Sequence, residues 1–201
     1  TPPNASSMKV LLSRLSVVAL LTLALMGCDA TGPADTVILN SNSPIPPTVE
    51  YTFEYDTEGR QQIGVRSQNA DTLASILRRN GFGRADVVSA RVERVVLERV
   101  SDPGPSSRGK EGPVVEVFDY LSGATVYLGP DAESGTRIAE ASFETTARTV
   151  SLGVDGANAV TDEVKSGAQP AFLSLDAGGD VPNRRDRVRV RVHFRIEVQG
   201  V

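Results

Sequence analysis

The C-terminal segment from Arg187 to Gln199, RVRVRVHFRIEVQ, alternates strictly between polar and apolar residues. A period of two is the pattern of a half-buried β-strand, and here valines, Phe194 and Ile196 form the apolar face. At about 3.3 Å per residue the strand extends roughly 40 Å, whereas ordinary strands have about five or six residues. Only another long strand can pair along it, so this segment commits the chain to a β-sheet body.

The polar face of the same segment is basic, and two interpretations of it stay open. Four cations side by side repel one another unless acids on neighbouring strands pair with them, at about 0.2–1 kcal/mol for each cross-strand pair. Acids are available at Glu50, Glu54, Glu93 and Glu98. Alternatively, the row is a docking face for an anionic surface such as lipid headgroups, lipopolysaccharide or an acidic partner. The row consists of Arg187, Arg189, Arg191 and Arg195, with His193 between the last two.

The period of two recurs upstream of this segment. Residues 48–56, TVEYTFEYD, have one aromatic and aliphatic face, and residues 61–66 run back after a turn, which predicts a hairpin. In residues 85–100 the alternation of Val88 with Ala90 and Val92 slips by one position before Val95. A slip of one residue within a strand predicts a β-bulge.

The rest of the pattern predicts an all-β fold, an antiparallel β-sandwich (immunoglobulin-like or jelly-roll-like) with one short helix. Turn residues separate the strands, and no alternation of strand and helix is present. The helix is expected in residues 69–81, where Leu73, Ile76 and Leu77 share a face and Gly81 ends it. Further strands are expected at residues 114–118, 124–128, 137–143, 148–154 and 171–175.

The N-terminal part of the sequence has the pattern of an export signal. Lys9 and Arg14 precede an apolar run of about a dozen residues, which is shorter than the roughly 20 that a membrane-spanning helix requires. The run ends in Leu25-Met26-Gly27-Cys28, which resembles the lipobox of bacterial lipoproteins. That resemblance implies a signal peptide over residues 8–27 and a diacylglyceryl group on the Cys28 thiol. The alternative is an ordinary secretory peptide that contains a cysteine.

The resemblance also implies a location and an organisation. The protein is expected in the cell envelope, held through its N-terminal lipid to the inner or outer membrane, with no free thiol and no disulfide. Residues 28–47 are rich in Pro, Ser and Asn and are expected to be a tether, in which residues 37–39 either dock as a short edge strand or stay flexible. The β-sandwich domain is expected over residues 48–201. Residues 1–7, before Met8, are set aside as non-native or mis-assigned.

The sequence offers little for catalysis. A nucleophile–histidine arrangement needs a base, and His193 alternates with arginines that disfavour its charged form, so we expect a polar surface side chain. No cofactor is predicted. Asp155, Asn158 and Asp162 offer oxygen ligands and are weak candidates for calcium, but their spacing does not match an EF-hand, and Asx turns explain them as well.

The expected function is therefore a non-catalytic binding or structural module that serves an envelope protein partner. A surface carbohydrate-binding or hydrolytic accessory protein is the alternative, with a glycan as its partner. Buried tyrosines favour the first function, and tyrosines exposed beside acids favour the second. The net charge of −4 and the extracytoplasmic location both argue against nucleic acid as a partner.

Replacing the lipobox cysteine tests the anchor. We expect Cys28→Ala to leave an unprocessed precursor without lipid, because the thiol is the group that is acylated. Partition into detergent and metabolic labelling with palmitate measure this, with the wild-type chain as control. Continued lipid labelling of Cys28→Ala would show that the lipoprotein interpretation is wrong.

Overall fold

The alternating segment forms β9 (Arg185–Gln199), the longest strand of the protein, and its inner row is closed to solvent. All six apolar side chains from Val188 to Val198 have an exposed fraction of 0%. The computed structural model describes residues 35–57, 59–67, 72–100, 120–142, 149–154, 159–167, 170–178, 181, 183 and 185–200. The body described below runs from Thr36 to Gly200.

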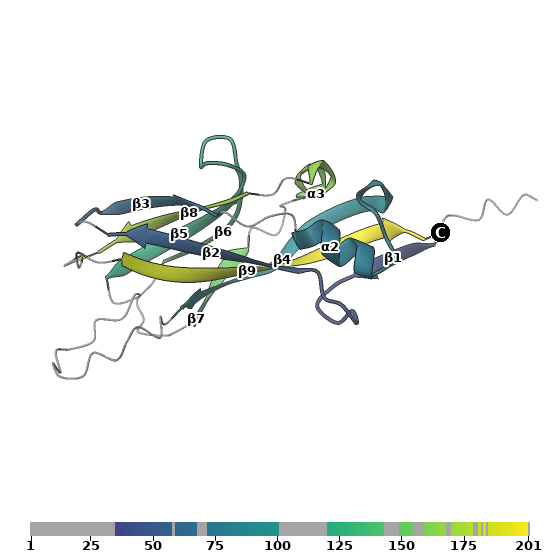
Figure 1. Cartoon of the computed structure of the whole chain (residues 1–201), viewed down its shortest axis with the longest axis horizontal. Coiled ribbons are helices and arrows are strands. Elements are labelled where there is room, and N and C mark those ends of the chain that lie inside the picture. Colours follow the sequence, from purple (N-terminus) through teal and green to yellow (C-terminus); the bar gives the residue numbers. More distant parts are fainter. Residues whose placement is uncertain are drawn as a thin grey trace, which may run out of the picture. The chain divides into compact units, whose positions relative to one another are not determined.

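The body is an all-β sandwich with short helices (Figure 1). In chain order its other strands are β1 (Thr36–Leu39), β2 (Thr48–Asp56), β3 (Gln62–Arg66), β4 (Val87–Arg99), β5 (Leu121–Leu128), β6 (Thr136–Ser142), β7 (Thr149–Val154) and β8 (Ala171–Ala177). The helical elements are α2 (Thr72–Arg79), the 3₁₀ turn η1 (Arg84–Asp86) and α3 (Thr161–Ser166). The antiparallel sandwich predicted from the sequence is confirmed, and α3 is a second short helix that was not predicted.

The strands are all paired antiparallel, in the order β1-β9-β4-β7-β6-β5-β8-β3, and β2 is also paired with β9. One layer contains β9 with β1, β2, β4 and β7, and the other contains β3, β8, β5 and β6 (Figure 1). β7 joins the layers, because it pairs with β4 on one side and with β6 on the other.

β9 organises the first layer because strands pair with it along both sides. On one side, β4 pairs with residues 188–198 of β9. On the other side, β2 pairs with residues 185–193 and β1 pairs with residues 196–199, so β1 and β2 lie end to end. The long partner that the sequence required is therefore β4, together with two shorter strands in line.

Because β1 belongs to the sheet, the predicted boundary at residue 48 is wrong, and the body begins at Thr36. The edge-strand interpretation of residues 37–39 is confirmed over the flexible one. The reason is the length of β9: β2 covers only nine of its residues, and the backbone groups beyond His193 need another partner. Leu39 is buried in the core at this point.

The predicted hairpin between residues 48–56 and 61–66 is also wrong. Both segments are strands, but β3 pairs with β8 in the opposite layer. The connection after Asp56 therefore crosses from one layer of the sandwich to the other. Local turn residues cannot distinguish a hairpin from such a crossing, since both reverse the chain.

The bulge predicted in residues 85–100 is confirmed, since the β4–β9 register shifts between Val92 and Arg94. A second shift lies between Val87 and Ser89. Because of it Val87 points inward, and Val88, which was predicted on the inner face, is exposed.

The remaining predictions concern shorter elements. The expected strands at 124–128, 137–143, 148–154 and 171–175 correspond to β5, β6, β7 and β8, with small differences at the ends. The expected helix is α2, with its predicted apolar face buried and Gly81 at φ 87°. The expected strand at 114–118 lies outside the described residues.

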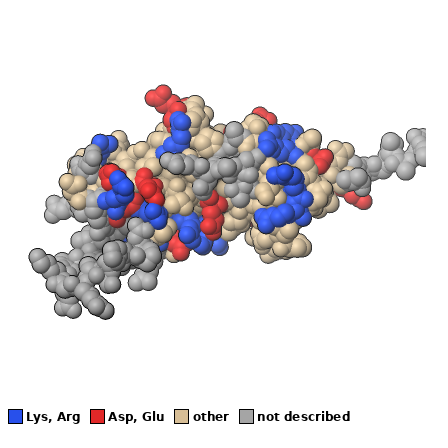
Figure 2. All heavy atoms as spheres, viewed as in Figure 1, with Lys and Arg blue, Asp and Glu red and all other residues tan. Residues whose placement is uncertain are grey.

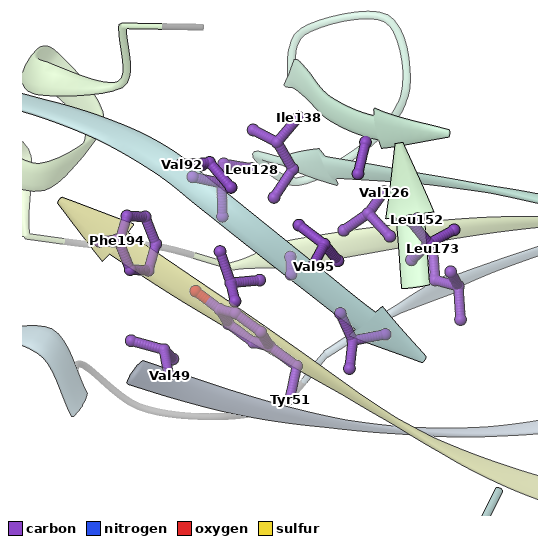
Figure 3. Packing of buried hydrophobic residues seen from close by; sticks show 14 of the residues in the cluster. Val49, Tyr51, Val92, Val95, Val126, Leu128, Ile138, Leu152, Leu173 and Phe194 are labelled. Carbon is purple, nitrogen blue, oxygen red and sulfur yellow. The ribbon is translucent and has the colours of Figure 1, made fainter. Parts of the chain in front are cut away.

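The core lies between the layers and continues beneath the far end of β9. Figure 3 shows Val49 and Tyr51 of β2 pointing toward β9 and β4, and Val126 and Leu173 pointing in from the other layer. Toward β1 the same cluster includes the inner face of α2. The apolar row of β9 is thus covered along its whole length by one continuous hydrophobic cluster.

Substitution in β1 tests the revised boundary. We expect Leu39→Ala to lower the free energy of unfolding by about 2–5 kcal/mol, because it removes a buried side chain. Ile38→Ala is the matched control, since Ile38 is exposed in the same strand and its loss should cost about 0.5 kcal/mol or less. Chemical denaturation measures both, and equal midpoints would mean that β1 does not contribute to the core.

Candidate functional site: the outer face of β9

The outer face of β9 carries the row of basic residues, and β2 places acids opposite half of it. In the β2–β9 register Glu50 faces Arg191, Glu54 faces Arg187 and Asp56 faces Arg185. The alternation of both strands brings this about, because each buries its apolar residues and turns its charged ones to the same outer side. Directly opposed residues in antiparallel strands lie close enough for their side chains to interact.

Ion pairs follow from this register. Arg191 Nε lies 2.8 Å from Glu50 Oε1, and Arg189 Nε lies 3.7 Å from the other oxygen of the same carboxylate. Arg187 pairs with Glu54. Figure 2 shows basic and acidic side chains next to each other over the part of the body where β2 and β9 run in Figure 1.

β4 supplies a further acid from the other side. Glu98 Oε2 lies 3.0 Å from a terminal nitrogen of Arg191, so this arginine is held between carboxylates of two neighbouring strands. Glu93, also offered by the sequence as a partner, makes no ion pair with the described residues. It lies at the bulge of β4, where the register shifts. Three of the four arginines of the predicted docking face are thus engaged in cross-strand pairs.

Arg195 is the exception. The residue opposite it on β4 is Arg91, and the next outer pair is Arg94 with His193. None of these three arginines has an ion pair within the described part of the chain. Arg195 is half-buried and its Nε has no hydrogen-bond partner there. The face predicted from the sequence therefore divides into a paired half beside β2 and an unpaired basic group, Arg91, Arg94 and Arg195.

His193 stands at the division between the halves. Its Nδ1 lies 2.9 Å from the Thr48 hydroxyl, so it links β9 to the start of β2. Burial lowers the pKa of His193 below its ordinary value, and the positive charges of Arg94 and Arg191 lower it further. The sequence correctly predicted the effect of the arginines on the charged form, but partial burial is the larger cause. At neutral pH the imidazole is uncharged and serves as a structural hydrogen-bonding group.

A buried polar network, not predicted from the sequence, lies at the opposite end of β9. The hydroxyl of Tyr120 donates to Asp186 Oδ2 at 2.6 Å and lies 3.0 Å from the Tyr55 hydroxyl. Burial raises the pKa of Tyr120 above its ordinary value, and Tyr55 and Asp186 raise it further. One sequence signal was available: continuing the inner row of β9 upstream from Val188 reaches Asp186, an acid where the pattern demands an apolar residue.

An open pocket of about 270 Å³ adjoins this network between β2 and β3. Its lining residues are Glu54, Tyr55, Asp56, Arg60, Ile63, Gly64 and Val65. Its two acids are already paired with Arg187 and Arg185. Both acids of the lining therefore take part in joining β2 to β9.

Of the three weak candidates for calcium, only one lies in the described part of the chain. Asp162 lies exposed in α3, while Asp155 and Asn158 lie outside the described residues. Across the described ranges, no three His, Cys, Asp or Glu side chains gather as ligands for a metal ion. Cys28 and the predicted signal peptide also lie outside the described residues.

Comparison with known proteins adds no family. Neither the protein-family models nor the curated proteins gave a match to the chain. In the described part of the chain, no helix has the length and apolar character needed to cross a membrane.

Removing one carboxylate tests the paired half. Glu50→Gln should lower the free energy of unfolding by about 1 kcal/mol or less at low salt, because half-exposed ion pairs contribute little individually and two arginines share this acid. The difference should shrink at high salt, where the charges are screened. Glu133→Gln, the same change of charge in an exposed loop, is the control. A loss that does not depend on salt would contradict the ion-pair assignment.

Proposed function

We propose that the protein is a lipid-anchored component of the cell envelope whose β-sandwich is a non-catalytic binding or structural module. The anchor part of the proposal rests on the resemblance of Leu25-Met26-Gly27-Cys28 to a lipobox. The module part rests on the way the body uses its chemically capable side chains. Glu50, Glu54 and Glu98 pair with arginines of β9 and so hold neighbouring strands together.

The observation that supports this choice best is the burial of three of the four tyrosines. Tyr51, Tyr55 and Tyr120 have exposed fractions of 1%, 5% and 2%, and Tyr127 packs against Phe172 with ring centroids 6.2 Å apart. A sugar-binding cleft needs aromatic faces that a ligand can reach. Three of the four tyrosines are thus part of the core, while Tyr127 is half-buried outside it. This balance favours the module over the carbohydrate-binding or hydrolytic alternative.

The edge strand β3 is the surface on which we expect a protein partner. It is the last strand in the order of the sheet and pairs, among the described strands, only with β8. Gln62, Gly64 and Arg66 along it are exposed. An edge strand presents backbone donors and acceptors to which a partner can add a strand of its own.

A photo-crosslinking residue at Gln62 tests this function in cells. We expect the full-length chain to give one crosslinked species of discrete mass in the membrane fraction, because the edge of β3 meets its partner there. The same probe at Glu140, an exposed residue of the internal strand β6, is the matched control and should give none. Retention of the purified protein on envelope polysaccharide, with release by soluble sugar, would instead support the carbohydrate-binding alternative.

A further inference from the structure

The exposed apolar side chains gather at one end of the sheet. In the described part of the chain the exposed large hydrophobic residues are Val37, Ile38 and Val88, with exposed fractions of 39%, 41% and 52%. Val37 is opposite Val198 of β9, and Val198 is opposite Val87, the neighbour of Val88. The three side chains therefore lie on the two strands that flank β9, within about 10 Å at the usual strand spacing. Ile38, opposite Glu197, is on the outer face of the sheet, whereas Val37, opposite Val198, is on the inner side. We call this region the β1 end.

The unpaired basic group lies next to the β1 end on the outer face. Arg195 and Arg91 face each other a few positions along β9 and β4, and Arg94 follows. Glu197 lies on the same face and accepts a hydrogen bond from Ser89 at 2.9 Å, and Glu93 lies at the bulge. With His193 uncharged, three arginines against two acids leave a positive excess. Each arginine also has an apolar stem that can lie along a membrane surface while its guanidinium reaches phosphate.

Further positive charge lies toward the same end of the body. α2 ends in Arg78 and Arg79, both exposed. In Figure 1 α2 and β1 lie toward the same end, and Figure 2 shows basic side chains gathered over this region. The paired arginines beside β2, in contrast, have their charge neutralised locally. Apolar exposure and unneutralised positive charge therefore occur together at one end.

The chain itself brings this end close to the expected anchor. Seven residues separate Cys28 from Thr36, the first residue of β1. Even fully extended, the chain from Cys28 to Thr36 spans at most about 30 Å. β1 is the first described strand after Cys28 in the chain. A lipid on Cys28 would hold the β1 end within this distance of the bilayer surface.

We propose that the β1 end is a membrane-contact surface that rests on anionic phospholipid headgroups. Ile38 and Val88 enter the interfacial layer, and Arg91, Arg94 and Arg195 contact headgroup phosphates. Apolar side chains bordered by cations are the combination that binds such interfaces. The proposal rests on lipidation of Cys28, because one or more acyl chains supply the stable attachment and the surface sets how the body lies on the bilayer.

An environment-sensitive fluorophore on Val88→Cys tests the contact in the lipidated full-length protein. The protein is reconstituted into vesicles of phosphatidylcholine, with or without phosphatidylglycerol, and iodide quenching is measured. We expect quenching at position 88 to fall several-fold in the vesicles that contain phosphatidylglycerol. The same label on Gln61→Cys, an exposed position before β3, should stay fully quenchable. The same fluorophore on Ile38→Cys gives a second measurement of iodide quenching at the β1 end, and it should be protected in the same way as position 88.

Charge variants then test the basic group. Arg195→Gln combined with Arg91→Gln should restore most of the quenching at position 88 in phosphatidylglycerol vesicles. Arg187→Gln combined with Arg189→Gln, which removes the same two charges from the paired half, should leave it protected. Equal effects of the two changes would overturn the role of the basic group.

The remaining outcomes separate this proposal from the one on which it rests. Failure of the protein to float with vesicles would overturn both the anchor and the contact surface. Flotation with equal quenching at positions 88 and 61 would overturn the contact surface alone. Protection at position 88 without vesicles, increasing with protein concentration, would assign the surface to a second copy of the chain and overturn the membrane proposal.

Discussion

The structure depends on the pairing of β9 along both of its sides. A strand of fifteen residues has too many backbone donors and acceptors for one ordinary neighbour, and each must be paired when the strand is buried. On one side, β4 pairs with nearly the full length of β9 and contains two bulges. On the other side, β2 pairs with the first part of β9 and β1 with the last part. The inner row of β9 then forms the spine of the core from Val188 to Val198.

The same strand explains why charge is distributed unevenly on the outer face. β2 and β9 alternate in phase, so Glu50, Glu54 and Asp56 of β2 face arginines of β9, and Arg189, which faces Thr52, reaches Glu50 instead. Beyond Thr48 the neighbour becomes β1, whose only described outward residues are uncharged, and the arginines lose their partners. The division between the paired half and the unpaired basic group is thus a consequence of where one short strand stops and the next begins.

Local periodicity was enough to predict the strands, the α2 face and the bulge at Val92, because burial on one side imposes its pattern on each segment separately. It could not decide which strand pairs with which. β3 was assigned to β2 because the two are adjacent in the chain, and Val88 was assigned to the core because a second bulge leaves no separate trace in one short run of valines. Asp186 shows the opposite case, in which a residue that breaks the inner pattern indicates a buried hydrogen bond. The partners Glu50 and Glu54 could be proposed, but only the register could separate them from Glu93.

The pairing of β1 and β2 with β9 also has a consequence for the order of folding. Thr48 and His193 contact each other across 145 positions of the chain, and every other strand is made before β9. The layer that holds β9 therefore cannot close until nearly the whole body has emerged, and contacts so distant in sequence form slowly. Until β9 is made, the apolar faces of β2 and β4 lack the strand that pairs between them.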